Sequence, residues 1–142
     1  MKAVCALSGP TDFLQMDAHA LKDAKLKHDF PGSAESRLIG GPIQKNKEKV
    51  AKANPITYVS KESPPFLLIH GDQDPLVPVH QAQLLHDALK EKGVAVQLHI
   101  VKGAGHGVGG RGVNELIDRF FDANLKMAGQ KKAAQAPKDA PK

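Results

Sequence analysis

The chain has 142 residues, a formal net charge of +5, 41% hydrophobic and 25% charged residues, which is the composition of a soluble globular domain. Its longest apolar runs fall far short of the ~20 residues that cross a bilayer, and its N-terminus lacks the long apolar stretch of a signal peptide. We therefore expect a soluble protein with no membrane partner. Its location stays open, since a full-length parent could be secreted. The single cysteine, Cys5, lies in an apolar run, which favours a buried and unreactive thiol.

The positive charge is concentrated near the C-terminus. Residues 128–142 hold four lysines and one aspartate, and the rest of the chain is nearly balanced. The chain has no tryptophan, one tyrosine and no aromatic residue among these lysines, so it lacks the stacking platform of a nucleic-acid-binding protein. Residues 128–142 instead predict a disordered Ala/Lys/Pro tail that follows a domain of residues 1–127.

Three short apolar runs predict β-strands, at residues 3–7, 65–69 and 94–101. Segments of helical periodicity alternate with them, which is typical of βαβ units, so we predict an α/β fold with a parallel sheet. The helix after the second run has its apolar stripe at Leu84, Leu85, Ala88 and Leu89, and the helix after the third run has its stripe at Val113, Leu116, Ile117, Phe120 and Phe121. We expect both stripes to pack against the sheet.

The segment between the first two runs is long for a simple crossover. It contains several weak helices, one of them near residues 44–53, which are separated by Gly- and Pro-rich turns. We interpret residues 12–62 as a small helical cap insertion and call them the cap segment.

Polar residues follow each of the three apolar runs. Residues 8–12 follow the first run, residues 70–78 the second and residues 103–107 the third. In an open parallel sheet, the loops at the carboxyl ends of the strands surround the ligand crevice. We therefore look for a site in these loops, and the second and third contain Asp74 and His106.

Asp74 and His106 are residue types that a serine-type hydrolase requires. A hydroxyl is a poor nucleophile until an imidazole takes its proton, and a carboxylate holds that imidazole in one tautomer and stabilises its charged form. Glycines on both sides of His106 allow a sharp turn of the backbone. We predict that the pair is catalytic. The alternative is that Asp74 caps the following helix and His106 is an ordinary polar loop residue.

The two loops also carry sequence motifs. Residues 70–78 read H-G-x-x-D-x-x-V-P, and residues 103–107 read G-x-G-H-G. Together they resemble the acid loop and the histidine loop of α/β-hydrolases, in particular of the esterase and lipase group that includes carbohydrate acetyl and feruloyl esterases and prolyl-oligopeptidase-like hydrolases. The resemblance covers about residues 1–127. It implies a partial α/β-hydrolase fold whose sheet is equivalent to strands six to eight, with flanking helices.

The resemblance also implies roles. Asp74 matches the acid and His106 the general base of a catalytic triad that hydrolyses a small-molecule carboxylic ester without a cofactor or metal. Gly71 and Pro78 match positions that shape the acid loop. One difference is Val108, which stands where the family often has an aromatic residue, and it bears on the wall of the acyl pocket.

The nucleophile of this family lies on a G-x-S-x-G turn, which the chain does not contain. Its five serines are Ser8, Ser33, Ser36, Ser60 and Ser63. In the family's order the nucleophile would precede the first strand, so the chain resembles a truncated or split hydrolase. Ser8 is the best substitute nucleophile, because it ends the strand beside the acid-bearing one. The alternative is that Ser8 is only a turn residue.

We do not expect the remaining carboxylates and histidines to be catalytic. We expect Asp72 to hydrogen-bond within its own loop, and residues 70–74 lack the second cluster that a metal site needs. The histidines that we expect on the surface or on a strand face are His19, His28, His80, His86 and His99.

In the complete fold that the resemblance implies, another strand would flank the strand at residues 3–7. An uncovered edge and apolar face promote association, so we predict a homodimer through this edge.

Two other functions compete with ester hydrolysis. Residues 105–110 read G-x-G-x-x-G between a strand and a helix, as in a dinucleotide-binding module, but that motif requires a further strand with an acidic end. The other is a non-catalytic scaffold or interaction domain, which the missing nucleophile favours and the retained Asp74 and His106 oppose.

Overall fold

A computed structural model describes residues 1–134 of the chain, with side chains described as far as Leu125. Its sheet has three strands, β1 (Val4–Leu7), β2 (Phe66–Gly71) and β3 (Val96–Val101). They are parallel and lie in the order β1-β2-β3. The central strand β2 is almost fully buried, because helices cover both faces of a parallel sheet joined by helical crossovers. The predicted α/β fold with a parallel sheet is confirmed.

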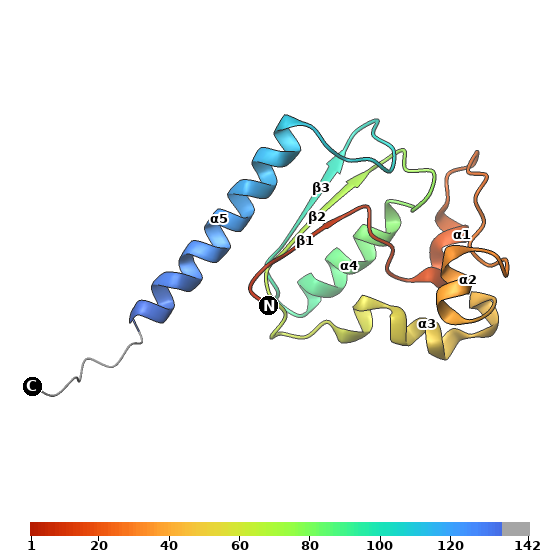
Figure 1. Ribbon diagram of the computed structural model, residues 1–142, viewed down its shortest axis with the longest axis horizontal. Helices are drawn as coiled ribbons and strands as arrows, with labels where there is room; N and C mark the ends of the chain where they lie inside the picture. The colour runs from red at the N-terminus through yellow and green to blue at the C-terminus, as the bar shows by residue number, and fades with distance from the viewer. Residues whose placement is uncertain (135–142) are drawn as a thin grey trace, which may run out of the picture.

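Two long helices cover opposite faces of the sheet. Helix α4 (His80–Glu91) lies on one side and α5 (Arg111–Ala134) on the other (Figure 1). Side chains alternate along β2, so Leu68 packs against α4, whereas Leu67 and Ile69 pack against α5. Both predicted apolar stripes therefore face the sheet. Helix α5 continues to Ala134, past the boundary expected near residue 128, and residues 135–142 lie outside the described part of the chain.

Short helices fill the cap segment. They are η1 (Phe13–Gln15), α1 (Met16–His19), α2 (Ala34–Ile39), η2 (Ile43–Lys45), α3 (Lys47–Ala53) and η3 (Pro55–Tyr58). They lie on the same side of the sheet as α4 (Figure 1). Their buried side chains form a cluster of their own, which Val77 from the segment after β2 completes: Phe13, Met16, Ile39, Ile43, Val50 and Val77. The helix expected near residues 44–53 is present as η2 and α3.

The first strand is paired on one side only. The amides of Val4 and Ser8 donate to the carbonyl oxygens of Pro65 and Ile69 at 3.0 and 2.9 Å, and within residues 1–134 no strand lies on the other side of β1. Beside α4, β1 and β2 leave an apolar groove of about 200 Å³. Burial raises the pKa of the half-buried Cys5 thiol in this strand, which disfavours the reactive thiolate. Within the described residues, no helix is long and apolar enough to span a bilayer.

Candidate active site

Asp74 and His106 meet at the carboxyl end of the sheet. Asp74 lies in the acid loop (residues 72–79), between β2 and α4, and His106 lies in the histidine loop (residues 102–110), between β3 and α5. The Nδ1 atom of His106 is 2.9 Å from the Oδ2 atom of Asp74. The Asp74 side chain is fully buried, whereas the His106 side chain is 45% exposed. The structure therefore brings together the two residues that the motifs indicate.

The other oxygen of Asp74 organises the acid loop itself. The amides of Leu76 and Val77 donate to Oδ1 at 2.9 and 3.0 Å, which is the geometry of an aspartate-stabilised turn. Oδ1 thus closes a turn inside the acid loop while Oδ2 faces His106. The alternative that Asp74 caps the following helix was wrong, because α4 begins after Val79 and has no side-chain cap. The turn holds the carboxylate in a single orientation.

The side chain of His70 contacts the same carboxylate. Its side chain is fully buried, and its Nε2 atom lies 2.9 Å from the carbonyl oxygen of Val77 and 3.2 Å from Oδ2 of Asp74. A single N–H can be shared between these two acceptors. The His70 Nδ1 atom has no hydrogen-bond partner among the described residues. From the sequence, residues 70–74 were considered only as a metal site and His70 was placed after the strand, so this contact was not predicted; in the structure His70 lies inside β2.

The acid and histidine loops are packed against each other through the main chain. A β-carbon on Gly71 would overlap the carbonyl oxygens of Ala104 and Gly105, so the close approach requires a glycine here. The amide of Gly103 donates to Oδ1 of Asp72 at 2.7 Å. The expectation that Asp72 bonds within its own loop was therefore wrong in its partner, because the bond crosses to the histidine loop.

The Ser8 side chain also contacts the histidine loop, at the main chain of that loop. Its hydroxyl donates to the carbonyl oxygen of His106 at 2.8 Å, and Ser8 is only 4% exposed. Its φ of 49° lies in the left-handed region that non-glycine residues rarely adopt. The hydroxyl is thus aimed at the backbone rather than the imidazole. This geometry supports a role in positioning the loop, and the role of Ser8 as a nucleophile stays a prediction.

The remaining histidines have different surroundings. His99 is exposed on β3, His86 bonds the neighbouring Asp87, and the rings of His19 and His80 stack with centroids 3.5 Å apart. His28 is 1% exposed, so its expected surface position was wrong.

Two other kinds of site were considered from the sequence. The glycine-rich stretch at residues 105–110 does lie between β3 and α5, but the described chain has no strand after α5. A dinucleotide fingerprint needs that strand. No group of three or more metal-ligating side chains gathers in the described part of the chain.

A parallel sheet whose strand-end loops hold a buried aspartate against an exposed histidine is typical of α/β-hydrolases. The chain matches the BD-FAE family over residues 1–89 and the dienelactone hydrolase family over residues 46–135. It belongs to this esterase-like group of α/β-hydrolases.

Individual relatives agree with this assignment. The chain is 46% identical to esterase LipQ of Mycobacterium tuberculosis over 43 residues, which cover 30% of the chain and 10% of LipQ. Among solved structures, a bifunctional GH43-CE protein of Bacteroides eggerthii is 32% identical with a TM-score of 0.70, covering 84% of this chain and 16% of that one. A truncated carbohydrate esterase from gut microbiota is 26% identical with a TM-score of 0.74, covering 88% of this chain and 43% of that one. The chain thus spans less than half the length of these relatives.

Proposed function

We propose that the chain supplies the acid and the base of a carboxylic ester hydrolase. The observation that carries this proposal is the bond between Oδ2 of Asp74 and Nδ1 of His106 at 2.9 Å. The other ring nitrogen, Nε2, makes no hydrogen bond to any described residue, and the ring is partly exposed. A buried carboxylate behind an accessible imidazole is the arrangement that general-base catalysis requires.

The chemistry follows from the tautomer. Because Asp74 is an acceptor, His106 carries its proton on Nδ1 and leaves a lone pair on Nε2. Nε2 takes the proton of a hydroxyl as that oxygen bonds the ester carbonyl carbon. The resulting imidazolium is stabilised by Asp74. The imidazolium then donates the proton to the alcohol oxygen of the ester, while the bond between the carbonyl carbon and this alcohol oxygen breaks.

The names of similar proteins support an ester as the substrate. LipQ is an esterase, and a solved relative is a carbohydrate esterase. The hydroxyl that attacks the ester is a separate question, since none of the chain's serines lies in a G-x-S-x-G turn. The names of these two relatives support a small-molecule carboxylic ester as the substrate class.

Hydrolysis of p-nitrophenyl acetate by the purified chain tests the proposal. This activated ester reacts even with a histidine that lacks a nucleophilic partner, so the assay reports the reactivity of the His106 ring. The matched variants are His106→Ala and His99→Ala, because His99 is also exposed but has no aspartate behind its ring in the described residues. We expect His106→Ala to lower the rate and His99→Ala to leave it unchanged. Equal rates for all three proteins would contradict the proposal and support the scaffold alternative.

Ser8→Ala separates the two roles of Ser8. If Ser8 is the nucleophile, this variant loses as much activity as His106→Ala. If Ser8 positions the loop through the carbonyl of His106, the variant keeps a measurable part of the His106-dependent rate. The geometry of the hydroxyl favours the second result.

A further inference from the structure

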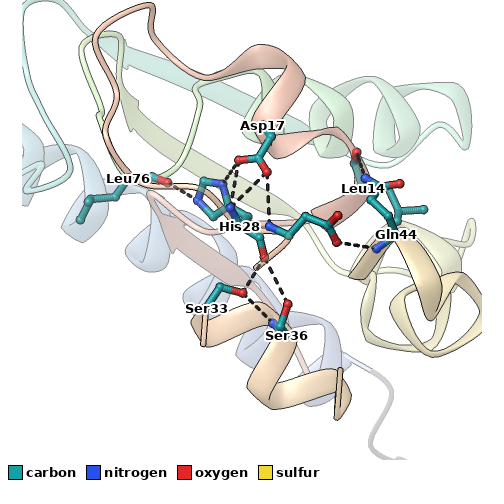
Figure 2. Close-up of polar contacts among 8 residues, drawn as sticks. Leu14, Asp17, His28, Ser33, Ser36, Gln44 and Leu76 are labelled. Carbon is teal, nitrogen blue, oxygen red and sulfur yellow. Dashed lines mark hydrogen bonds and ion pairs between the residues drawn. The ribbon is translucent and has the colours of Figure 1, made fainter. Parts of the chain in front are cut away.

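A second histidine and aspartate pair lies beneath the acid loop. Figure 2 shows the His28 ring between Asp17 and the main chain of Leu76. The Nδ1 atom is 2.8 Å from Oδ1 of Asp17, and the Nε2 atom is 2.9 Å from the carbonyl oxygen of Leu76. Asp17 lies on α1, 11 positions before His28 in the same cap segment, whereas Leu76 lies in the acid loop, 48 positions after it.

The two contacts require a charged ring. A carbonyl oxygen and a carboxylate are acceptors, and a neutral imidazole has a single N–H, so a neutral His28 would point a lone pair at one of them. Burial raises the pKa of the Asp17 carboxyl, but the hydrogen bonds and charge of His28 outweigh burial and leave that pKa below its usual value. Asp17 is therefore ionised and cannot donate to the ring. Both bonds form only when His28 carries a proton on each nitrogen.

Hydrogen bonds to the main chain of His28 also fix its position. Its amide donates to both carboxylate oxygens of Asp17 at 3.0 and 3.1 Å. The hydroxyls of Ser33 and Ser36 donate to its carbonyl oxygen. The other acidic neighbour, Asp29, uses its carboxylate to accept the amide of Gln44 at 2.8 Å. Among the described residues, Asp17 is thus the one ionic partner of the imidazolium.

One peptide group connects His28 to Asp74. The carbonyl of Leu76 and the amide of Val77 are the two ends of the same peptide unit. Its oxygen accepts from His28, and its N–H donates to Oδ1 of Asp74 at 3.0 Å. Hydrogen bonds arranged in such a chain polarise and strengthen one another. Val77 is also buried in the apolar cluster of the cap segment, so the peptide is held from both sides.

We propose that His28 is a positioning residue, a buried imidazolium that orients Asp74 toward His106 through the Leu76–Val77 peptide. The name of this role rests on the proposed function, because Asp74 is the acid only in an ester hydrolase. The contacts do not rest on it. His28 thereby makes the order of the acid loop depend on the cap segment.

Nuclear magnetic resonance of the purified chain with ¹⁵N-labelled histidine tests the charge without any variant. We expect both ring nitrogens of His28 to show the protonated pattern at neutral pH. An unprotonated Nδ1 or Nε2 would overturn the proposal. The experiment uses no substrate, so its outcome is independent of the ester-hydrolysis assay.

Two neutral variants test the positioning. The amide nitrogen of Gln reaches the place of Nε2, and that of Asn the place of Nδ1. His28→Gln therefore keeps a donor for Leu76, whereas His28→Asn keeps one for Asp17. We expect the Val77 amide to exchange with solvent about tenfold faster in His28→Asn, the effect of one lost hydrogen bond, and the His106 Nδ1 proton signal to shift. His28→Gln should keep both near their wild-type values.

The Leu68 amide in β2 is the internal reference, because its exchange reports global stability. A purely structural role would accelerate Val77 and Leu68 together and to a similar degree in both variants. That result would overturn the proposal. If the His28 nitrogen signals and the amide exchange rates are as expected but the chain does not hydrolyse the ester, the result counts against the ester-hydrolase function alone.

Discussion

Gly71 lies directly against the main-chain carbonyl of Ala104, with no space for a β-carbon between them. Gly71 is the last residue of β2, and Ala104 begins the approach to His106, so this contact sets how closely the acid and histidine loops approach. The Asp74–His106 bond therefore depends on a residue that takes no part in the chemistry.

Gly71→Ala should separate the two loops. We expect the free energy of unfolding to fall by about 1–3 kcal/mol, as for an overpacked core position, and the His106-dependent hydrolysis rate to fall with it. Urea denaturation and the ester assay measure the two effects. Gly109→Ala is the control, because a β-carbon there meets no atom within 4 Å. Equal stability of the two variants would show that the loops tolerate a wider separation.

Asp74→Asn should reverse the tautomer of His106. The amides of Leu76 and Val77 hold the side-chain oxygen at the Oδ1 position, so the NH₂ group of Asn faces His106 and donates to its Nδ1. The proton then moves to Nε2, which can no longer act as a base. We expect the His106-dependent rate to fall by about 10²-fold or more.

Asp72→Asn is the matched control for that change. Its oxygen can still accept the Gly103 amide, so its rate should stay near that of the wild type. Nitrogen chemical shifts of His106 report the tautomer directly. An unchanged Nδ1–H tautomer in Asp74→Asn would contradict the role assigned to Asp74.

Stability at acid pH should depend on Asp17. Its pKa is lower in the folded chain than the usual value, so the folded state binds this proton more weakly than the unfolded state. The stabilisation is therefore complete above the usual carboxyl pKa and is lost as pH falls through the lower, folded value. Urea denaturation from about pH 6 to about pH 3 should show a shallower acid decline for Asp17→Asn than for the wild type.

The exposed Asp23 provides the comparison for Asp17. Asp23→Asn should keep the acid decline of the wild type. If Asp17→Asn and Asp23→Asn decline alike, the pair of Asp17 with His28 does not contribute to acid stability.

The open edge of β1 should mediate association. Leu7 is 44% exposed on this strand, and a lysine there opposes pairing with a second edge. We expect the wild type to be a dimer by light scattering at micromolar concentration, and Leu7→Lys to be a monomer. Leu38→Lys, at a residue 71% exposed on α2, should leave the dimer intact. A monomeric wild type would refute the predicted homodimer.

The sequence predicts the parts of this fold that local patterns encode. The stripe that includes Leu85 and Leu89 repeats at helical spacing, and the run around Ile69 has the composition of a buried strand, so both elements are recognisable without tertiary contacts. Asp74 and His106 are recognisable for a related reason. Each follows a strand, and parallel strands bring their carboxyl ends to one edge.

Contacts between distant segments were not predictable in the same way. His28 lies in a segment without periodicity, and its partner Leu76 is 48 positions away, so nothing local distinguishes it from a surface histidine. The direction of the Ser8 hydroxyl depends on a left-handed backbone conformation that Ser does not ordinarily favour. In both cases packing, rather than residue preference, decides where the side chain points.

The apolar cluster of the cap segment bears on the cooperativity of unfolding. Val77 completes the apolar core of the short helices, yet it lies in the acid loop, beyond β2 in the chain. The cap segment therefore reaches its full stability only after β2 has formed, and the acid loop becomes ordered only when that core closes. We expect both to unfold in one cooperative transition, with no populated intermediate in which a folded cap stands beside a disordered Asp74.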